Sequence, residues 1–382
     1  MAIPNTLAVR LTQNRESNKI KKMKLNNLII LFFFSLILSA QENASLVLNK
    51  YFQAIGGINS INRVQSIYSF ANCIGPNGKY ETEIQSAKDN KTIFRQIKEN
   101  KPDYIGIVNG DNYWTKGIEI EISNKNSAFI WRSHELQWIA THLTERFRDA
   151  KFIRNEDFEG KQAVKISVID ELDKTAYLYF EKNTNLLLGL TIFNPFEENQ
   201  DTIRLSINDW KKVDKLLLPS KVTFSDKQGD FILNFHTIKI NQINQANFNT
   251  PKKIIAIKKL LELHELQRNA HFNRDAKLLT SIMADNFTEV RNGKINTPKK
   301  EDLFNRFQGY FDSVTFIEWD DIQPPIIKIS DDATLAQIFV QKRVKLKTNE
   351  NQVESTIYAW TATFKKNLNN WVMTSITSTE NK

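Results

Sequence analysis

Residues 242–253 read Gln-Ile-Asn-Gln-Ala-Asn-Phe-Asn-Thr-Pro-Lys-Lys, and the hydrophobic pattern changes across this stretch. Before it, apolar residues recur mostly with period two, as in strands; after it they follow the spacing of a long helix. The stretch is polar, and Pro251 suits the first position of a helix, with Thr250 as the expected N-cap. We therefore interpret it as a linker between two domains, residues 41–248 and 249–382.

The first domain is predicted to be α+β and rich in antiparallel strands. Residues 44–55 carry apolar side chains at helical spacing, and Gly56 and Gly57 end that helix. A short helix at 58–64 follows. Turn signals then separate a series of short strands, predicted at 67–74, 79–86, 92–97, 104–108, 112–122, 152–155, 163–169, 176–181, 186–193, 203–213, 217–225 and 231–240.

One helical segment interrupts these strands. Residues 133–148 place Leu136, Ile139, Ala140 and Leu143 on one helical face, with Ser133 as the expected N-cap. A sheet of this size needs cover on one face, and the helices are the natural cover. The prediction is a large, curved antiparallel sheet capped by helices.

The second domain is predicted to begin with helices and to end with strands. The helices are expected at 251–273, 276–283 and 299–311, and the strands at 313–322, 326–330, 333–347, 354–366 and 370–378.

The N-terminus has the pattern of a secretory signal peptide over residues 1–40. Four lysines between positions 19 and 24 precede an apolar run at 28–38, which Ser39 and Ala40 follow. The run is shorter than the roughly 20 residues of a spanning helix, so a retained anchor is the lesser alternative. Met23 is an alternative start of translation. The prediction is an exported bacterial protein, periplasmic or extracellular, with no transmembrane segment in its mature chain.

The cysteine content agrees with that prediction, and the charge bears on nucleic-acid binding. Cys73 is the only cysteine, so the chain has no internal disulfide. The formal charge is +9, but residues 1–40 hold six of the 52 basic and one of the 43 acidic residues. The remaining 46 basic and 42 acidic residues are too balanced for a nucleic-acid-binding surface.

Residues 44–248 resemble the LolA-like family of periplasmic lipoprotein carriers and lipid-binding sheets. The resemblance rests on residues 51–57, 158–166, 179–187 and 210–222. Lys215 departs from the pattern, because the family has glycine there. The resemblance implies a groove that binds an acyl chain or another lipid. The candidate lining residues are Phe70, Ile84, Phe94, Ile105, Trp114, Phe129, Trp131, Phe180, Phe224 and Phe235, most of which must also serve as core.

Residues 252–380 resemble the NTF2-like superfamily, in its SnoaL-like or calcium/calmodulin-kinase-association-like branch. The resemblance rests on the long helix 254–273, Asp275 before a short helix, residues 284–287, the helix 300–311 and the strand pair 360–365 and 370–373. It implies an α+β cone of sheet wrapped around helices, with a pocket at its wide end.

The sequence holds no motif that identifies catalysis. Phosphate-binding loops, zinc spacings and nucleophile elbows are missing, so neither a cofactor nor a metal is expected. Enzymes that the cone resembles use a pocket Asp or His as base. Candidate pocket residues are His264, His271, Asp285, Trp319, Arg343, Tyr358 and Trp360. His264 and His271 lie seven apart and share a helix face, and Asp285 would have a raised pKa if buried.

Three functions remain open. The first is binding or carriage of a lipid or other apolar small molecule. The second is a small SnoaL-like enzyme in residues 249–382, although the chain is more simply read as a non-enzyme. The third is assembly, as a homodimer through the second domain's sheet, with contacts drawn from Ile338, Val340, Ile357 and Ala359. Alternate residues of a strand face opposite sides of the sheet. Only the residues on one side can therefore lie at such an interface, and those on the other side face the interior.

Overall fold

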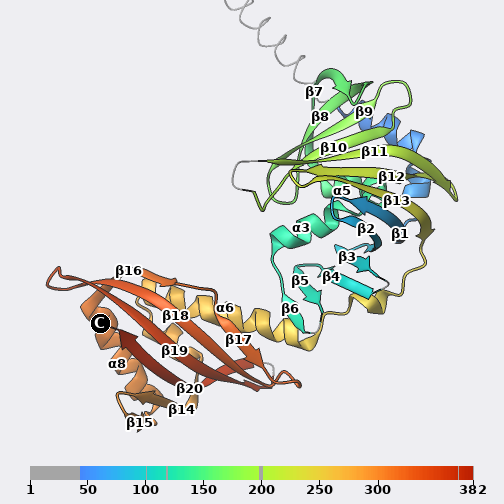
Figure 1. Ribbon diagram of the computed structural model, residues 1–382. Coiled ribbons are helices and arrows are strands. Elements are labelled where there is room, and N and C mark those ends of the chain that lie inside the picture. Colours follow the sequence, from blue (N-terminus) through green and yellow to red (C-terminus); the bar gives the residue numbers. More distant parts are fainter. Residues whose placement is uncertain (1–43, 100, 118, 198–200, 369, 382) are drawn as a thin grey trace, which may run out of the picture. The chain divides into compact units, whose positions relative to one another are not determined.

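The computed structural model describes residues 44–381 except 100, 118, 198–200 and 369 (Figure 1). The predicted signal peptide therefore lies outside the described residues. By internal contacts the chain forms two compact units. The first holds the chain up to Gly110 and Asn124–Phe248, and the second holds Asp111–Ser123 and the chain from Asn249 onward. No helix in the described ranges is both long and apolar enough to cross a membrane.

A single 13-stranded antiparallel sheet dominates the N-terminal part of the chain, in the order β6-β5-β4-β3-β2-β1-β13-β12-β11-β10-β9-β8-β7. Hairpins join most neighbours, while β1 pairs with β13 and so links two meanders. The strands are β1 Ser66–Gly75, β2 Gly78–Ala87, β3 Lys91–Lys98, β4 Lys101–Asn109, β5 Asn112–Lys116, β6 Ile120–Ile122, β7 Arg148–Phe158, β8 Lys161–Ile169, β9 Thr175–Glu181, β10 Leu187–Phe193, β11 Thr202–Val213, β12 Leu216–Asp226 and β13 Gly229–Ile240.

Most of the predicted strands of this sheet are present, with one difference. The stretch 112–122 was predicted as one strand and forms the hairpin β5–β6 instead, with Trp114 opposite Ile122. This hairpin continues the edge of the large sheet, yet by its contacts it groups with the second unit.

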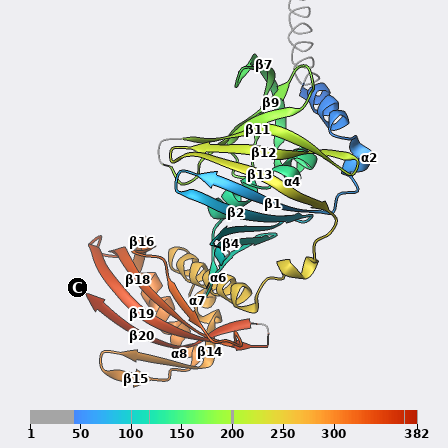
Figure 2. The ribbon, with the colours of Figure 1, turned by 45° about the vertical axis from the view of Figure 1, so that its right-hand side comes forward.

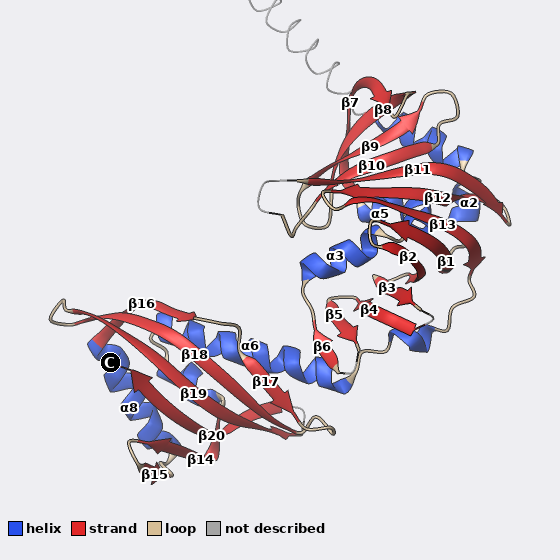
Figure 3. Cartoon of the chain, viewed as in Figure 1, coloured by secondary structure: helices blue, strands red, loops and turns tan. Residues whose placement is uncertain are grey.

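Helices lie against the large sheet, as Figure 3 shows by its blue segments between the red strands. They are residues 44–54, α2 Ile58–Ile61, α3 Lys125–Ser133, α4 Leu136–Thr141 and α5 Leu143–Arg146. The Tyr51 hydroxyl donates to the carbonyl of Ala140 at 2.7 Å, and the Tyr51 ring meets Phe180 edge-on. These buried contacts fasten the first helix to α4 and to the sheet.

The predicted continuous helix 133–148 is wrong. Ser133 ends α3 rather than capping a helix, and Asn124 caps α3 through the Ser127 amide. The chain breaks again at Glu135 and at His142, which flank α4. The cause is tertiary, because the buried Glu135 carboxylate accepts hydrogen bonds from Arg132, Arg146 and Thr92. This ion cluster overrides the local helical pattern.

The second unit places three helices against a seven-stranded sheet (Figure 2). The helices are α6 Lys252–Phe272, α7 Ala276–Ser281 and α8 Lys300–Ser313. Helix α6 begins at Lys252, so Pro251 rather than Thr250 occupies the N-cap position. Asp275 caps α7 by accepting from the Leu278 amide at 2.8 Å.

The sheet of the second unit has the order β15-β14-β20-β19-β18-β16, with β17 also paired to β18. Its strands are β14 Met283–Arg291, β15 Lys294–Asn296, β16 Val314–Asp321, β17 Ile326–Ile329, β18 Leu335–Thr348, β19 Val353–Asn367 and β20 Asn370–Asn381. The five C-terminal strands were predicted, but β14 and β15 were missed. Met283, predicted as the end of a helix, opens β14, which runs parallel to β20.

The described residues are therefore mostly antiparallel sheet with some helices, as the α+β prediction required. The cone form of the second unit stays a prediction.

Candidate ligand-binding site

The second unit contains a cavity of about 460 Å³ between its helices and its sheet. All three helices and five strands contribute to the wall. The lining residues are Gln267, His271, Leu279, Met283, Phe287, Glu289, Arg291, Asn292, Arg306, Phe307, Tyr310, Phe316, Trp319, Val344, Tyr358, Trp360, Met373, Ile376, Ser378, Thr379 and Glu380.

The periodicity of the elements explains which side chains reach the cavity. On β19, Tyr358 and Trp360 point to the same face as the buried Ala362 and Phe364, because alternate strand residues share a face. On α6, Gln267 and His271 lie four residues apart and therefore share a helix face. Sheet and helix thus present these two pairs of side chains to the same space.

Aromatic rings form most of one wall. His271 stacks on Trp319 with ring centroids 4.3 Å apart and planes 22° apart, and its edge meets Phe316 at 5.2 Å. Trp319 in turn lies 5.9 Å from Trp360. Apolar walls with a few placed polar groups are the usual composition of a small-molecule site, and this volume lies in the range of such sites.

His271 is held in one neutral tautomer. Its Nδ1 lies 2.6 Å from the carbonyl oxygen of Gln267, which can only accept, so Nδ1 carries the proton. Burial lowers the pKa of His271 to about 4, against the smaller opposing effect of that hydrogen bond. The ring is therefore uncharged at neutral pH, and its Nε2 is an acceptor.

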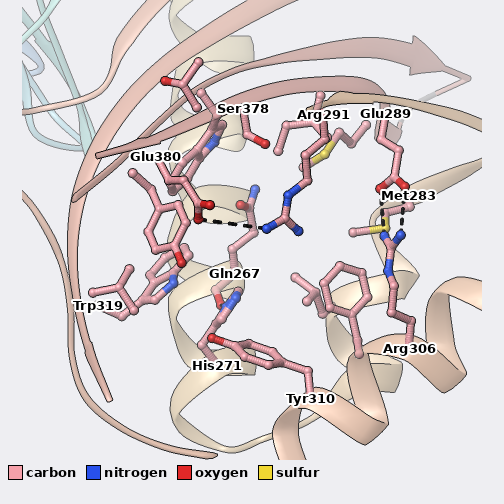
Figure 4. Close-up of a pocket in the computed structure, with 18 of the residues that line it drawn as sticks. Gln267, His271, Met283, Glu289, Arg291, Arg306, Tyr310, Trp319, Ser378 and Glu380 are labelled. Carbon is pink, nitrogen blue, oxygen red and sulfur yellow. Dashed lines mark hydrogen bonds and ion pairs between the residues drawn. The ribbon is translucent and has the colours of Figure 1, made fainter. Parts of the chain in front are cut away.

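Charged residues stand at the other side of the cavity (Figure 4). Arg306 is bound by both carboxylate oxygens of Glu289, each at 2.7 Å. Arg291 meets Glu380 only at 4.0 Å. The labelled side chains of Gln267 and Arg291 point toward one another across the space. Two arginines and two glutamates therefore line this side of the cavity.

A buried ionic cluster supports the wall from behind. Lys342 is 1% exposed, and its Nζ lies 2.8 Å from Asp321 and 4.0 Å from the centre of the Trp319 ring. Asp321 also binds His264 Nε2 at 2.9 Å. Burial lowers the pKa of Lys342, and Asp321 opposes that shift. The cluster fixes Trp319 in position beneath His271.

Four of the predicted site residues meet in this cavity: His271, Trp319, Tyr358 and Trp360. His264 does not line it and belongs to the cluster behind Trp319. Arg343 is half-exposed and pairs with Glu318 at 3.5 Å.

The remaining predicted site residues lie elsewhere. The Asp285 side chain is 96% exposed, which removes the burial that a catalytic role would need. Trp114 and Phe180 are buried on β5 and β9 and line neither this cavity nor the cavity of the first unit that Phe94 and Trp131 line.

Sequence reasoning missed the polar residues of the cavity. Glu289 and Arg291 lie on β14, which was not predicted, and Glu380 lies beyond the predicted end of the last strand. Gln267 had a usable signal, since it sits one helical turn before His271 on the same face.

The first unit has a second, separate cavity of about 480 Å³. Its wall includes Phe94, Trp131 and Phe224 from the predicted groove, together with Tyr80, Gln96, Tyr104, Ser127, Ile130, His134, Asn194, Phe196, Glu197, Ile203, Asp226, Gln228 and Phe231. His134 stacks on Phe224 at 4.5 Å, and burial lowers the pKa of His134 to about 4. Rings from α3, its C-cap His134 and the sheet thus line the groove, together with the side chains of Glu197 and Asp226.

Neither site resembles a metal centre. Among the described residues, no group of three or more His, Cys, Asp or Glu side chains is placed to hold an ion.

Comparisons with known proteins give structural likenesses only. No protein-family profile matches the sequence, and no curated protein is a significant match. A LolA superfamily protein from Nitrosomonas europaea is 10% identical over 54% of this chain and 97% of its own, with a TM-score of 0.40. A DUF1329 family protein from Desulfovibrio piger is 11% identical over 54% and 97%, with a TM-score of 0.38.

The similarity to a third protein covers a smaller share of this chain. An NTF2-like protein of unknown function in nutrient uptake from Rhodospirillum rubrum is 12% identical over 32% of this chain and 98% of its own, with a TM-score of 0.28. The similarity to LolA superfamily and DUF1329 proteins thus extends over about half of this chain, and the NTF2-like similarity over about a third. At these scores the likenesses assign the chain to no family.

Proposed function

We propose that this is an exported protein that binds or carries an apolar small molecule or lipid, and that the cavity of the second unit holds it. The observation that carries the proposal is the composition of that cavity. Aromatic and aliphatic side chains from helices and sheet line much of a cavity of about 460 Å³, and its charged side chains, Glu289, Arg291, Arg306 and Glu380, gather at one side. Burial of an apolar ligand there would release water from apolar surface, which favours binding.

The cavity is better suited to binding than to acid–base catalysis. A general base works best when its pKa lies near the operating pH. Burial holds the pKa of His271 at about 4, and Asp285 is exposed rather than placed in the cavity. A SnoaL-like enzyme therefore remains the weaker alternative.

The groove of the first unit is the second candidate place for a lipid. Its walls carry Phe94, Trp131, Phe224 and Phe231, which offer the apolar contact that an acyl chain needs. A carrier with two such sites could take different ligands in each, so the two must be tested separately.

Dimerisation through the second unit's sheet remains a proposal of its own. Ile338 and Val340 are buried in the core of the unit, so they are not available as contacts. Ile357 and Ala359 lie on the opposite face and are partly exposed. Light scattering at micromolar concentration tests this proposal, because a monomer there contradicts it.

The experiment for the function is native mass spectrometry of protein purified from an exported pool, followed by solvent extraction of any bound molecule. We expect a mass increment that disappears on extraction and returns when fatty acids or other apolar compounds are added. If no small molecule co-purifies and no apolar compound binds, the proposed function is wrong.

A further inference from the structure

We propose that the second-unit cavity selects an apolar monocarboxylate, whose carboxylate binds Arg291 and Gln267. This inference rests on the proposed function and adds the chemical class of the ligand. It starts from two polar side chains that line the cavity and have hydrogen-bonding capacity to spare.

Gln267 is the first of these side chains. It is 6% exposed, and its amide has no hydrogen-bond partner within the described ranges of the chain, although its backbone carbonyl accepts from His271. The amide faces the cavity, so its nitrogen can donate to a ligand oxygen that enters there.

Arg291 is the second polar side chain of the cavity with hydrogen-bonding capacity to spare. A guanidinium has five N–H donors arranged to bind a planar carboxylate with two parallel hydrogen bonds. The contact of Arg291 with Glu380, at 4.0 Å, is too long for a hydrogen bond and leaves those donors available to a ligand. Figure 4 shows its guanidinium directed into the cavity, toward Gln267.

Arg306 is not a competing anchor. Glu289 already binds it through two hydrogen bonds of 2.7 Å, and Glu289 is 13% exposed. Replacing that carboxylate with a ligand would strand a largely buried charge, which is costly. Among the described residues that line the cavity, one cation therefore remains for an anionic ligand, which favours one carboxylate rather than two.

The rest of the wall defines the other end of the ligand. Beyond Gln267 the cavity continues between Trp319, Trp360 and Phe316, where His271 is uncharged. A second polar group placed there would lose its hydration with few partners. The ligand body is therefore apolar, and flat aromatic bodies suit the stacked rings.

The test compares two probes of equal shape, 2-naphthoate and 2-naphthamide, by isothermal titration calorimetry with the full chain. We expect naphthoate to bind wild type roughly tenfold more tightly, since hydrogen bonds to charged groups are stronger than hydrogen bonds between neutral groups. Arg291→Met should reduce this ratio to about one while affinity for naphthamide stays within about twofold. Arg343→Met is the matched control, because Arg343 lies outside the cavity, and it should keep the wild-type ratio.

The outcomes separate this inference from the proposed function. Equal binding of both probes by wild type overturns the carboxylate preference and leaves the function standing. A preference that survives in Arg291→Met overturns Arg291 as the anchor. Binding of neither probe by wild type overturns the inference and counts against the cavity as a binding site. A circular dichroism spectrum of each variant shows that the comparison is made on folded protein.

Discussion

His271 donates a hydrogen bond from Nδ1 to the carbonyl oxygen of Gln267, one turn earlier on the same helix, at 2.6 Å. The bond sets the tautomer, so Nε2 is left as an acceptor while Trp319 covers one ring face. The bond fixes the tautomer, while burial lowers the pKa of His271 to about 4 and so keeps the ring uncharged at neutral pH. Protonation of His271 at low pH would therefore change the charge of the ligand site.

The first prediction concerns that pH dependence. The pKa of His271 is lowered from 6.5 to about 4, so the unfolded chain binds a proton that the folded chain does not. The contribution of the neutral His271 to the free energy of unfolding is fully present above pH 6.5. The free energy of unfolding falls as the pH drops from 6.5 toward 4, by on the order of a few kcal/mol. His271→Phe keeps an aromatic ring that does not titrate and should reduce this slope, while His134 and His142, whose pKa values are also lowered to about 4, maintain the remainder. Urea unfolding between pH 4 and 7 measures it, and an unchanged slope would contradict the assignment.

The second prediction concerns the buried Lys342. Asp321→Ala strands that charge and should cost roughly 3 kcal/mol or more, whereas Lys342→Met removes the charge and should cost less. Asp320→Ala is the matched control, because Asp320 is half-exposed and pairs only with Arg268 in the described structure, and should cost about 1 kcal/mol or less. Chemical denaturation of the three variants measures the order, and equal losses from all three would refute it.

The third prediction concerns the groove of the first unit. A methyl group at Gly106 on β4 would collide with the ring of Trp131, which lines the groove from α3. Gly106→Ala should cost roughly 1–3 kcal/mol and shift tryptophan fluorescence, because the indole must move. Gly309→Ala in α8 has open space around it and should be neutral or stabilising. Thermal unfolding compares them; a neutral Gly106→Ala would show that α3 yields easily.

The fourth prediction concerns the domain boundary. Fragments 41–248 and 249–382 should each fold cooperatively when expressed alone, because each has its own sheet and core. Circular dichroism and urea unfolding of each fragment test this. The hairpin β5–β6 is the point of risk, since by contacts it groups with the second unit. If either fragment gives only a disordered spectrum, the boundary is wrong.

The sequence predicted most elements because their hydrophobic periods are regular. It failed where long-range contacts decide the local structure. The Glu135 ion cluster joins residues far apart in the chain and divides the predicted helix 133–148. Strand β14 begins two residues after α7 ends, so no turn signal separates the two elements.

The part of the candidate site that lies on elements with regular hydrophobic periods was predicted, and the part that depends on long-range pairing was not. His271, Trp319, Tyr358 and Trp360 sit on regular elements whose inward faces follow from period, and the structure brings them together. Arg291 sits on a strand that was not predicted, and its direction into the cavity depends on the parallel pairing of β14 with β20. Local sequence carries no signal for such a pairing.

The central claim, that the second-unit cavity binds an apolar ligand, is tested most directly by filling it. Ile376 lines the cavity from β20, whereas Ile357 lies on the other face of the neighbouring strand β19. Fluorescence titration with the neutral apolar probe N-phenyl-1-naphthylamine compares Ile376→Trp with Ile357→Trp. We predict saturable binding that Ile376→Trp abolishes or weakens at least about tenfold, a loss of about 1.4 kcal/mol, and that Ile357→Trp preserves. Equal binding by both folded variants would contradict the claim.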